Sequence, residues 1–158
     1  MEKAKSSLNI QKSKKLESWA WGLVIYTLVV IVWGAWVRIS HSGDGCGDTW
    51  PLCQGVLIPE AAQNKTWIEY THRAMSGIYG IVVFAFFIYC WRKKDHPSLK
   101  NAALATLIFT ITEALLGAKL VLFGLVGANT SLYRGFVISL HQINSLLLVG
   151  ATVWLAWA

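Results

Sequence analysis

The sequence has little of the polar surface that a soluble domain needs. Charged residues make up only 14% of its 158 residues, whereas 55% are hydrophobic and nine are tryptophan. A soluble domain of this length would have nowhere to bury so much apolar surface. The net charge of +6 does not indicate a nucleic-acid partner, because the Lys and Arg residues lie between apolar runs and form no basic stripe. The composition therefore favours a membrane protein.

The sequence also lacks a low-complexity linker and the signs of a cleaved signal peptide. No run of Gly, Ser or Pro divides the chain, so one domain is expected. The first apolar run follows a lysine-bearing tail, but it is too long for the apolar region of a signal peptide and no small-x-small cleavage site follows it. We therefore expect this run to be a retained helix.

Four apolar runs have the length of membrane spans, which is about 20 residues for ~30 Å of hydrocarbon. They cover residues 19–37, 70–91, 101–123 and 135–158, with a long loop at 40–68 between the first two. The predicted fold class is all-α, an integral membrane four-helix bundle formed by residues 19–158. A basic tail, residues 1–18, precedes it and is expected to be disordered, because it has too little apolar surface to pack.

Basic residues predict the orientation, because short loops rich in Lys and Arg stay in the cytoplasm. The tail and the connection around residues 92–100 carry most of them. We therefore expect a multi-pass protein of the plasma membrane, surrounded by lipid, with its N- and C-termini in the cytoplasm. The 40–68 loop then lies on the extracytoplasmic side.

Cysteine is scarce, yet two of the three cysteines share the 40–68 loop. Cys46 and Cys53 face an oxidising compartment in this orientation and are expected to form a disulfide, with two free thiols as the alternative. Cys90, at the cytoplasmic end of the second run, is expected to stay a thiol. A membrane thiol oxidoreductase generally needs a second cysteine pair in an outer loop, and residues 125–134 contain none. A membrane thiol oxidoreductase is therefore the least favoured of the functions considered.

Two histidines lie inside the apolar runs, where an ionisable residue is by default a candidate for function. His72 and His141 are both within roughly 10 Å of the outer boundary, at ~1.5 Å per helical residue. Equal depth on two helices is what the axial ligands of a haem iron require, since the iron is reached from opposite faces of a flat macrocycle. A hydrogen bond across helices, or a place beside a water pocket, would explain either histidine alone. The matched pair favours ligation of a haem iron.

Charged neighbours extend this candidate site. Glu69 precedes His72 by one turn and is suited to proton transfer at a haem edge, although a carboxylate is also favourable near a helix N-terminus. Three arginines at outer helix ends, Arg38, Arg73 and Arg134, are expected to bind haem propionates. Snorkelling to the membrane interface is the alternative for each arginine.

Helices three and four add polar residues to the same region. Asn144 and Ser145 share a face with His141 and are expected to orient its ring through a hydrogen bond. Glu113 and Lys119 have no assigned role, because their spacing of six residues is poor for a pair on one helix.

Four motifs from residue 34 onward form an ordered set. They are GAWVRISHSG from Gly34, WPLCQG from Trp50 with Cys46 before it, IEYTHR from Ile68, and LHQ from Leu140. Together they resemble the haem A synthase family, from about residue 34 to the end. The resemblance implies oxidation of the ring D methyl group of haem O to a formyl group, which gives haem A for the terminal oxidase. It leaves open whether activated oxygen hydroxylates the methyl group or whether electron removal precedes attack of water.

The resemblance also implies site residues and partners. His72 and His141 are the implied ligand pair, Glu69 the acid near the reacting haem, and Cys46 with Cys53 the outer-loop pair. Family members look like two four-helix halves, one with haem b and one that receives the substrate haem, and this chain is similar to the N-terminal half. Either a homodimer or a second polypeptide is then expected to supply the other half, or the chain is a fragment of a longer protein. Haem O synthase and the terminal oxidase are the expected partners in assembly.

Two functions of another class are alternatives to a haem A synthase. A four-helix b-type cytochrome that transfers electrons to or from quinone would need only two histidines on facing helices. A haem-binding oxidase assembly factor without turnover would need the same pair. Conversion of haem O to haem A would distinguish a haem A synthase from both of these alternatives.

Overall fold

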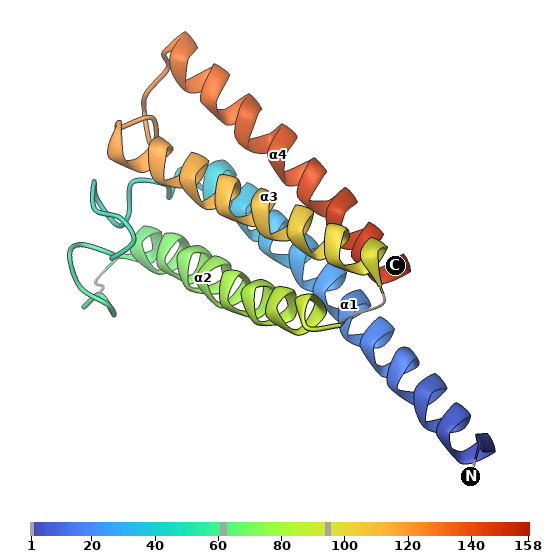
Figure 1. Cartoon of the computed structure of the whole chain (residues 1–158). Coiled ribbons are helices and arrows are strands. Elements are labelled where there is room, and N and C mark those ends of the chain that lie inside the picture. Colours follow the sequence, from blue (N-terminus) through green and yellow to red (C-terminus); the bar gives the residue numbers. More distant parts are fainter. Residues whose placement is uncertain (1, 61–62, 94–95) are drawn as a thin grey trace.

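The computed structural model describes residues 2–60, 63–93 and 96–158, and in these residues it contains four helices and no strand. The helices are α1 (Glu2–Ile39), α2 (Asn64–Trp91), α3 (Pro97–Leu122) and α4 (Leu132–Trp157), shown in Figure 1. Each is long and apolar enough to cross a membrane. The prediction of an all-α four-helix membrane bundle is confirmed. Residues 94 and 95, in the basic connection that served to predict the orientation, lie outside the described residues.

All four helices begin earlier than predicted, α3 at Pro97 rather than at residue 101 and α4 at Leu132 rather than at residue 135. α1 begins at Glu2, so the segment expected to be a disordered tail is helical, and the apolar span starts within it at Leu16. Good helix formers dominate this segment, and no Gly or Pro precedes Gly22. α2 begins at Asn64 rather than at residue 70, which shortens the loop after α1.

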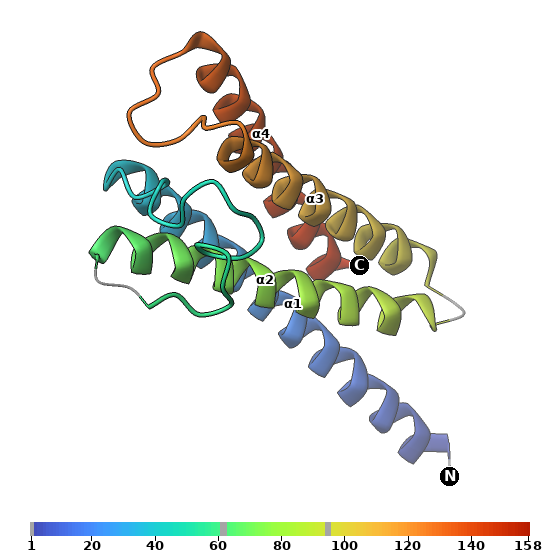
Figure 2. The ribbon, with the colours of Figure 1, turned by 90° about the vertical axis from the view of Figure 1, so that its left-hand side faces the viewer.

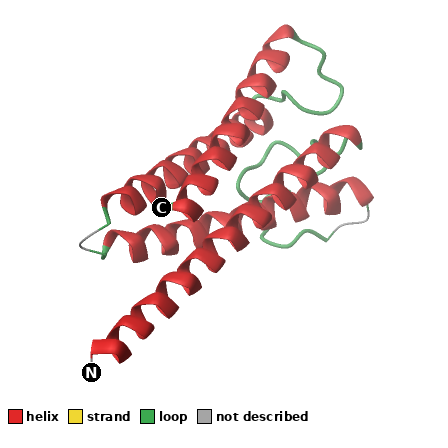
Figure 3. Ribbon diagram, turned by 90° about the vertical axis from the view of Figure 1, so that its right-hand side faces the viewer, coloured by secondary structure: helices red, strands yellow, loops and turns green. Residues whose placement is uncertain are grey.

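The helices form a closed ring in the order α1, α2, α3, α4. Consecutive helices pack against each other, and α4 packs against α1. In the part of the chain that the structure describes, the diagonal pairs α1/α3 and α2/α4 make no backbone contact. The α1–α2 loop and the α3–α4 turn lie at one end of the bundle, called the loop end below (Figures 2 and 3). The C-terminus and the extended N-terminal part of α1 lie at the opposite end (Figure 1).

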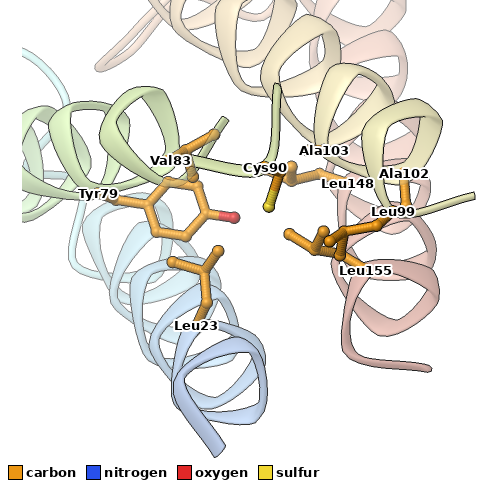
Figure 4. Close-up of a cluster of buried hydrophobic side chains, with 9 residues drawn as sticks. All are labelled: Leu23, Tyr79, Val83, Cys90, Leu99, Ala102, Ala103, Leu148 and Leu155. Carbon is orange, nitrogen blue, oxygen red and sulfur yellow. The ribbon is translucent and has the colours of Figure 1, made fainter. Parts of the chain in front are cut away.

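An apolar cluster holds the bundle together away from the loop end (Figure 4). It contains Leu23, Tyr79, Val83, Cys90, Leu99, Ala102, Ala103, Leu148 and Leu155, which come from all four helices. Cys90 is fully buried there as a free thiol, as predicted. The histidines and carboxylates of the candidate site, His72, His141, Glu69 and Glu113, lie nearer the loop end.

Candidate functional site

His72 and His141 lie at similar distances from the loop end. His72 is eight residues past the start of α2, and His141 is nine residues past the start of α4, which corresponds to about 12 Å and about 14 Å of helix. α2 and α4 are diagonal helices of the ring. The bundle therefore places two imidazoles on diagonal helices at matched depth.

A glycine of a neighbouring helix lies against each imidazole. A Cβ atom on Gly34 of α1 would lie 2.8 Å from Cε1 of His72, and one on Gly117 of α3 would lie 3.8 Å from Cε1 of His141. A residue larger than glycine at position 34 would therefore collide with the His72 ring. The Nδ1 atoms of both rings are buried, and neither has a hydrogen bond from the described residues. Among the described residues Nδ1 of His72 thus has no polar partner, whereas Nδ1 of His141 lies against a carboxylate.

Glu113, to which the sequence alone assigned no function, lies beside His141. Its Oε1 is 3.2 Å from Nδ1 of His141, although the ring N–H is too poorly aligned with that oxygen to count as a hydrogen bond. Asn144 donates to Oε2 at 2.7 Å, and the Ser145 hydroxyl donates to Oε1. Asn144 and Ser145 therefore hold Glu113, and not the His141 ring as expected. A lone carboxylate in an apolar helix was the signal for this site residue.

Lys119 does not join this group. Its Nζ lies 5.5 Å from the centre of the Tyr133 ring, over the aromatic face. This cation–π contact accounts for a lysine in the membrane-spanning part of α3.

Glu69 contacts the loop that follows α1. Its Oε2 accepts a hydrogen bond from the Cys46 N–H at 2.7 Å, and its Oε1 accepts from Arg73 at 2.5 and 3.1 Å. The same guanidinium donates to the carbonyl oxygens of Thr49 and Leu52 at 2.6 and 2.7 Å. Glu69 is only 3% exposed. Glu69 and Arg73 thus fasten the loop to α2, and we call this pair with its contacts the loop latch.

The disulfide predicted between Cys46 and Cys53 is present. Both cysteines are buried, and the Cys46 carbonyl accepts from the N–H of Gln54 at 3.0 Å. The Thr66 hydroxyl of α2 donates to the Gly45 carbonyl at 2.9 Å. The loop that carries the disulfide therefore packs directly onto the first turns of α2.

Replacing Arg73 should weaken the loop latch strongly. Arg73→Gln leaves the Glu69 carboxylate, whose side chain is 4% exposed, without its cation, and removing one partner of a buried pair costs about 3–5 kcal/mol. Lys65→Gln is the matched control, because the Lys65–Asp44 pair is 3.8 Å apart with side chains 51% and 49% exposed. Its loss should cost at most about 1 kcal/mol. The thermal unfolding of both variants in detergent measures these losses of stability. If Arg73→Gln destabilised the protein as little as Lys65→Gln, the loop latch would be contradicted.

Arg38 and Arg134 line one small cavity of about 40 Å³ at the loop end. Arg38 donates to the side chain of Gln142 at 2.8 Å, and Arg134 donates to two backbone carbonyls of the α3–α4 turn. Arg73, the third expected propionate ligand, is not among the residues that line the cavity, because the loop latch engages it. The three arginines therefore divide into a pair at this cavity and one in the latch.

Comparison with known proteins covers almost the whole chain. The model of a family described as cytochrome oxidase assembly protein, COX15-CtaA, matches residues 17–158. A protoheme IX farnesyltransferase of Thermus thermophilus is 43% identical over 145 residues, which are 90% of this chain and 24% of that protein. A heme A synthase of Halalkalibacterium halodurans is 42% identical over 109 residues, 68% of this chain and 37% of that protein.

A heme A synthase of Bacillus licheniformis is 40% identical over 131 residues, which are 82% of this chain and 42% of that protein. The chain thus spans less than half the length of these relatives. No solved structure matches.

Proposed function

Because the chain belongs to the family of cytochrome oxidase assembly proteins, we propose that it is a four-helix haem-binding unit of haem A synthesis. In this proposal it oxidises the ring D methyl group of haem O to a formyl group. The likeness to heme A synthases over 68% and 82% of this chain supports the activity. The observation that carries the proposal is the pair of imidazoles at matched depth on diagonal helices of the ring.

The residues present fit a haem in their donor set. His72 and His141 would hold the iron of a b-type haem, or of haem O as the substrate. A bound haem supplies the redox chemistry, which the protein's own side chains do not provide. Gly34 keeps the space that the His72 ring occupies. Arg38 and Arg134 would bind the propionates, because a guanidinium suits a carboxylate and both line the cavity at the loop end.

Glu69 is proposed as the acid of this reaction, and Glu69→Gln tests that role. The amide should leave haem binding intact, because neither imidazole changes, but turnover should fall about 100-fold or more, the size typical of lost acid–base catalysis. Arg73→Gln is the control, since it breaks the loop latch and keeps the carboxylate. Turnover is measured as haem A formed from haem O. An equal loss in both variants would reassign Glu69 to holding the loop.

We also propose a place in the cell. The protein is a multi-pass membrane protein, and we place it in the plasma membrane with the disulfide loop outside and both termini in the cytoplasm. The disulfide supports this orientation, because such bonds persist in oxidising compartments, and so do the basic residues at the other end of the bundle. Protease access to a tag on the N-terminus, in intact and in inverted vesicles, tests it.

A second four-helix unit is part of the proposal, because the heme A synthases matched are more than twice as long as the stretch they share with this chain. A second copy of this chain or another polypeptide would supply it. Haem O synthase would deliver the substrate, and the terminal oxidase would receive haem A. The protoheme IX farnesyltransferase relative supports the link to haem modification.

Expression in a membrane that makes haem O tests the function directly. The purified chain is examined by its reduced-minus-oxidised spectrum, and its haems are extracted and separated by chromatography. Haem A, or a hydroxylated haem O, would support the synthase. A b-type spectrum without any product of haem O would favour the electron carrier or the assembly factor. A chain without haem would overturn the proposal.

A further inference from the structure

We propose that Glu113 is a positioning residue for His141 and makes the two histidines unequal ligands, with His141 the stronger one. This inference rests on the proposed function, in which the two imidazoles hold a haem iron. It adds a residue of α3 to a site that the sequence placed on α2 and α4. The two imidazole rings differ in what surrounds them.

The Glu113 carboxylate is held beside His141 from several sides. Oε1 lies 3.2 Å from Nδ1 of the ring, and the Ser145 hydroxyl donates to the same oxygen. Asn144 donates to Oε2 at 2.7 Å, while its own Oδ1 accepts from the Thr112 hydroxyl at 2.7 Å. Asn144 and Ser145 are buried. This network, from two helices, fixes the carboxylate at the edge of the ring.

Among the residues that the structure describes, no carboxylate makes a comparable contact with the His72 ring. Its Nδ1 is buried without a hydrogen-bond partner among the described residues. The carboxylate one turn before it, Glu69, accepts from the Cys46 N–H and from Arg73 in the loop latch. Gly34 of α1 lies against this ring and offers no polar side-chain atom.

This difference decides how strongly each ring donates to a metal. A carboxylate beside Nδ1 favours the tautomer with the proton on Nδ1, which leaves the lone pair of Nε2 free for the iron. The carboxylate also makes the ring more basic, which stabilises the ferric state and lowers the reduction potential. His72 lacks this partner. It would therefore be the weaker of the two ligands.

The reduction potential of the haem-loaded chain tests the role of Glu113. In Glu113→Gln the ferric to ferrous ratio at a given potential should fall about tenfold, a rise in midpoint potential of about 59 mV for one electron. Glu60→Gln is the matched control, because it removes the same charge from an exposed loop residue and should shift the potential little. An equal shift in both variants would overturn the proposal.

Ser145→Ala provides a second variant if Glu113→Gln does not retain haem. It keeps the carboxylate but removes one of its donors, so that Glu113 accepts more strongly from the ring and the midpoint potential falls. A shift opposite in sign to that of Glu113→Gln distinguishes positioning from loosened packing, which would move both variants in the same direction. No shift, or a rise, would overturn the proposal.

Nitrogen-15 NMR of the histidine-labelled, haem-free chain tests the same contact without a cofactor. We expect His141 to carry its proton on Nδ1 and to lose this preference in Glu113→Gln, while His72 is unchanged. A proton on Nε2 of His141 would overturn the inference. Failure of the wild-type chain to bind haem would overturn the proposed function instead, and the NMR result separates the two.

Discussion

Haem binding is expected to be lost when either His72 or His141 is replaced by alanine. Each imidazole would hold the iron from its own helix, and α2 and α4 stand at diagonal positions, so neither could substitute for the other. We expect the haem-to-protein ratio of the purified chain to fall at least about tenfold, which corresponds to about 1.4 kcal/mol of binding free energy or more. Absorbance spectra and chromatography of extracted haem measure this ratio.

His96→Ala is the matched control for these two variants. His96 is exposed and precedes α3, at the end of the bundle away from the loops, so its replacement should leave the haem content unchanged. If His141 is the stronger ligand, His141→Ala should lose more haem than His72→Ala. A full haem complement in both variants would remove the histidines from the site.

Gly34→Ala is expected to displace the His72 ring and to weaken haem binding without removing a ligand. The added Cβ would lie 2.8 Å from Cε1 and 3.2 Å from Nε2 of His72, which is closer than van der Waals contact allows. Overpacking of this kind costs about 1–3 kcal/mol, more than the gain of up to about 1 kcal/mol from replacing a glycine within a helix. The haem-to-protein ratio and the thermal unfolding temperature should both fall.

Gly117→Ala provides a matched comparison beside the other histidine. Its Cβ would lie 3.8 Å from Cε1 of His141, an ordinary contact, so haem should be retained and the helix should gain up to about 1 kcal/mol. Gly22→Ala, with nothing within 4 Å of the added Cβ, reports the helix gain alone. Loss of haem in Gly117→Ala, or none in Gly34→Ala, would show that these packing contacts do not set the ligand positions.

The spans and the disulfide could be predicted because they depend on residues close in the sequence. An apolar run of about 20 residues must cross the membrane as a helix, since its backbone groups find no other partners there. Cys46 and Cys53 are only seven residues apart in one loop. The start of α1 was missed, because the helix propensity of a polar segment competes closely with disorder.

The sequence by itself determined that His72 and His141 stand at similar depth, because depth in a helix is a matter of counting residues. Only the tertiary structure decided what each side chain contacts. It placed Glu69 in the loop latch, Glu113 beside His141, and Gly34 under the His72 ring. In a membrane, lipid and neighbouring helices are equally apolar, so the apolar pattern of a helix does not specify which face turns inward. The rotation of each helix about its axis, and with it every contact between helices, is settled only by packing the four together.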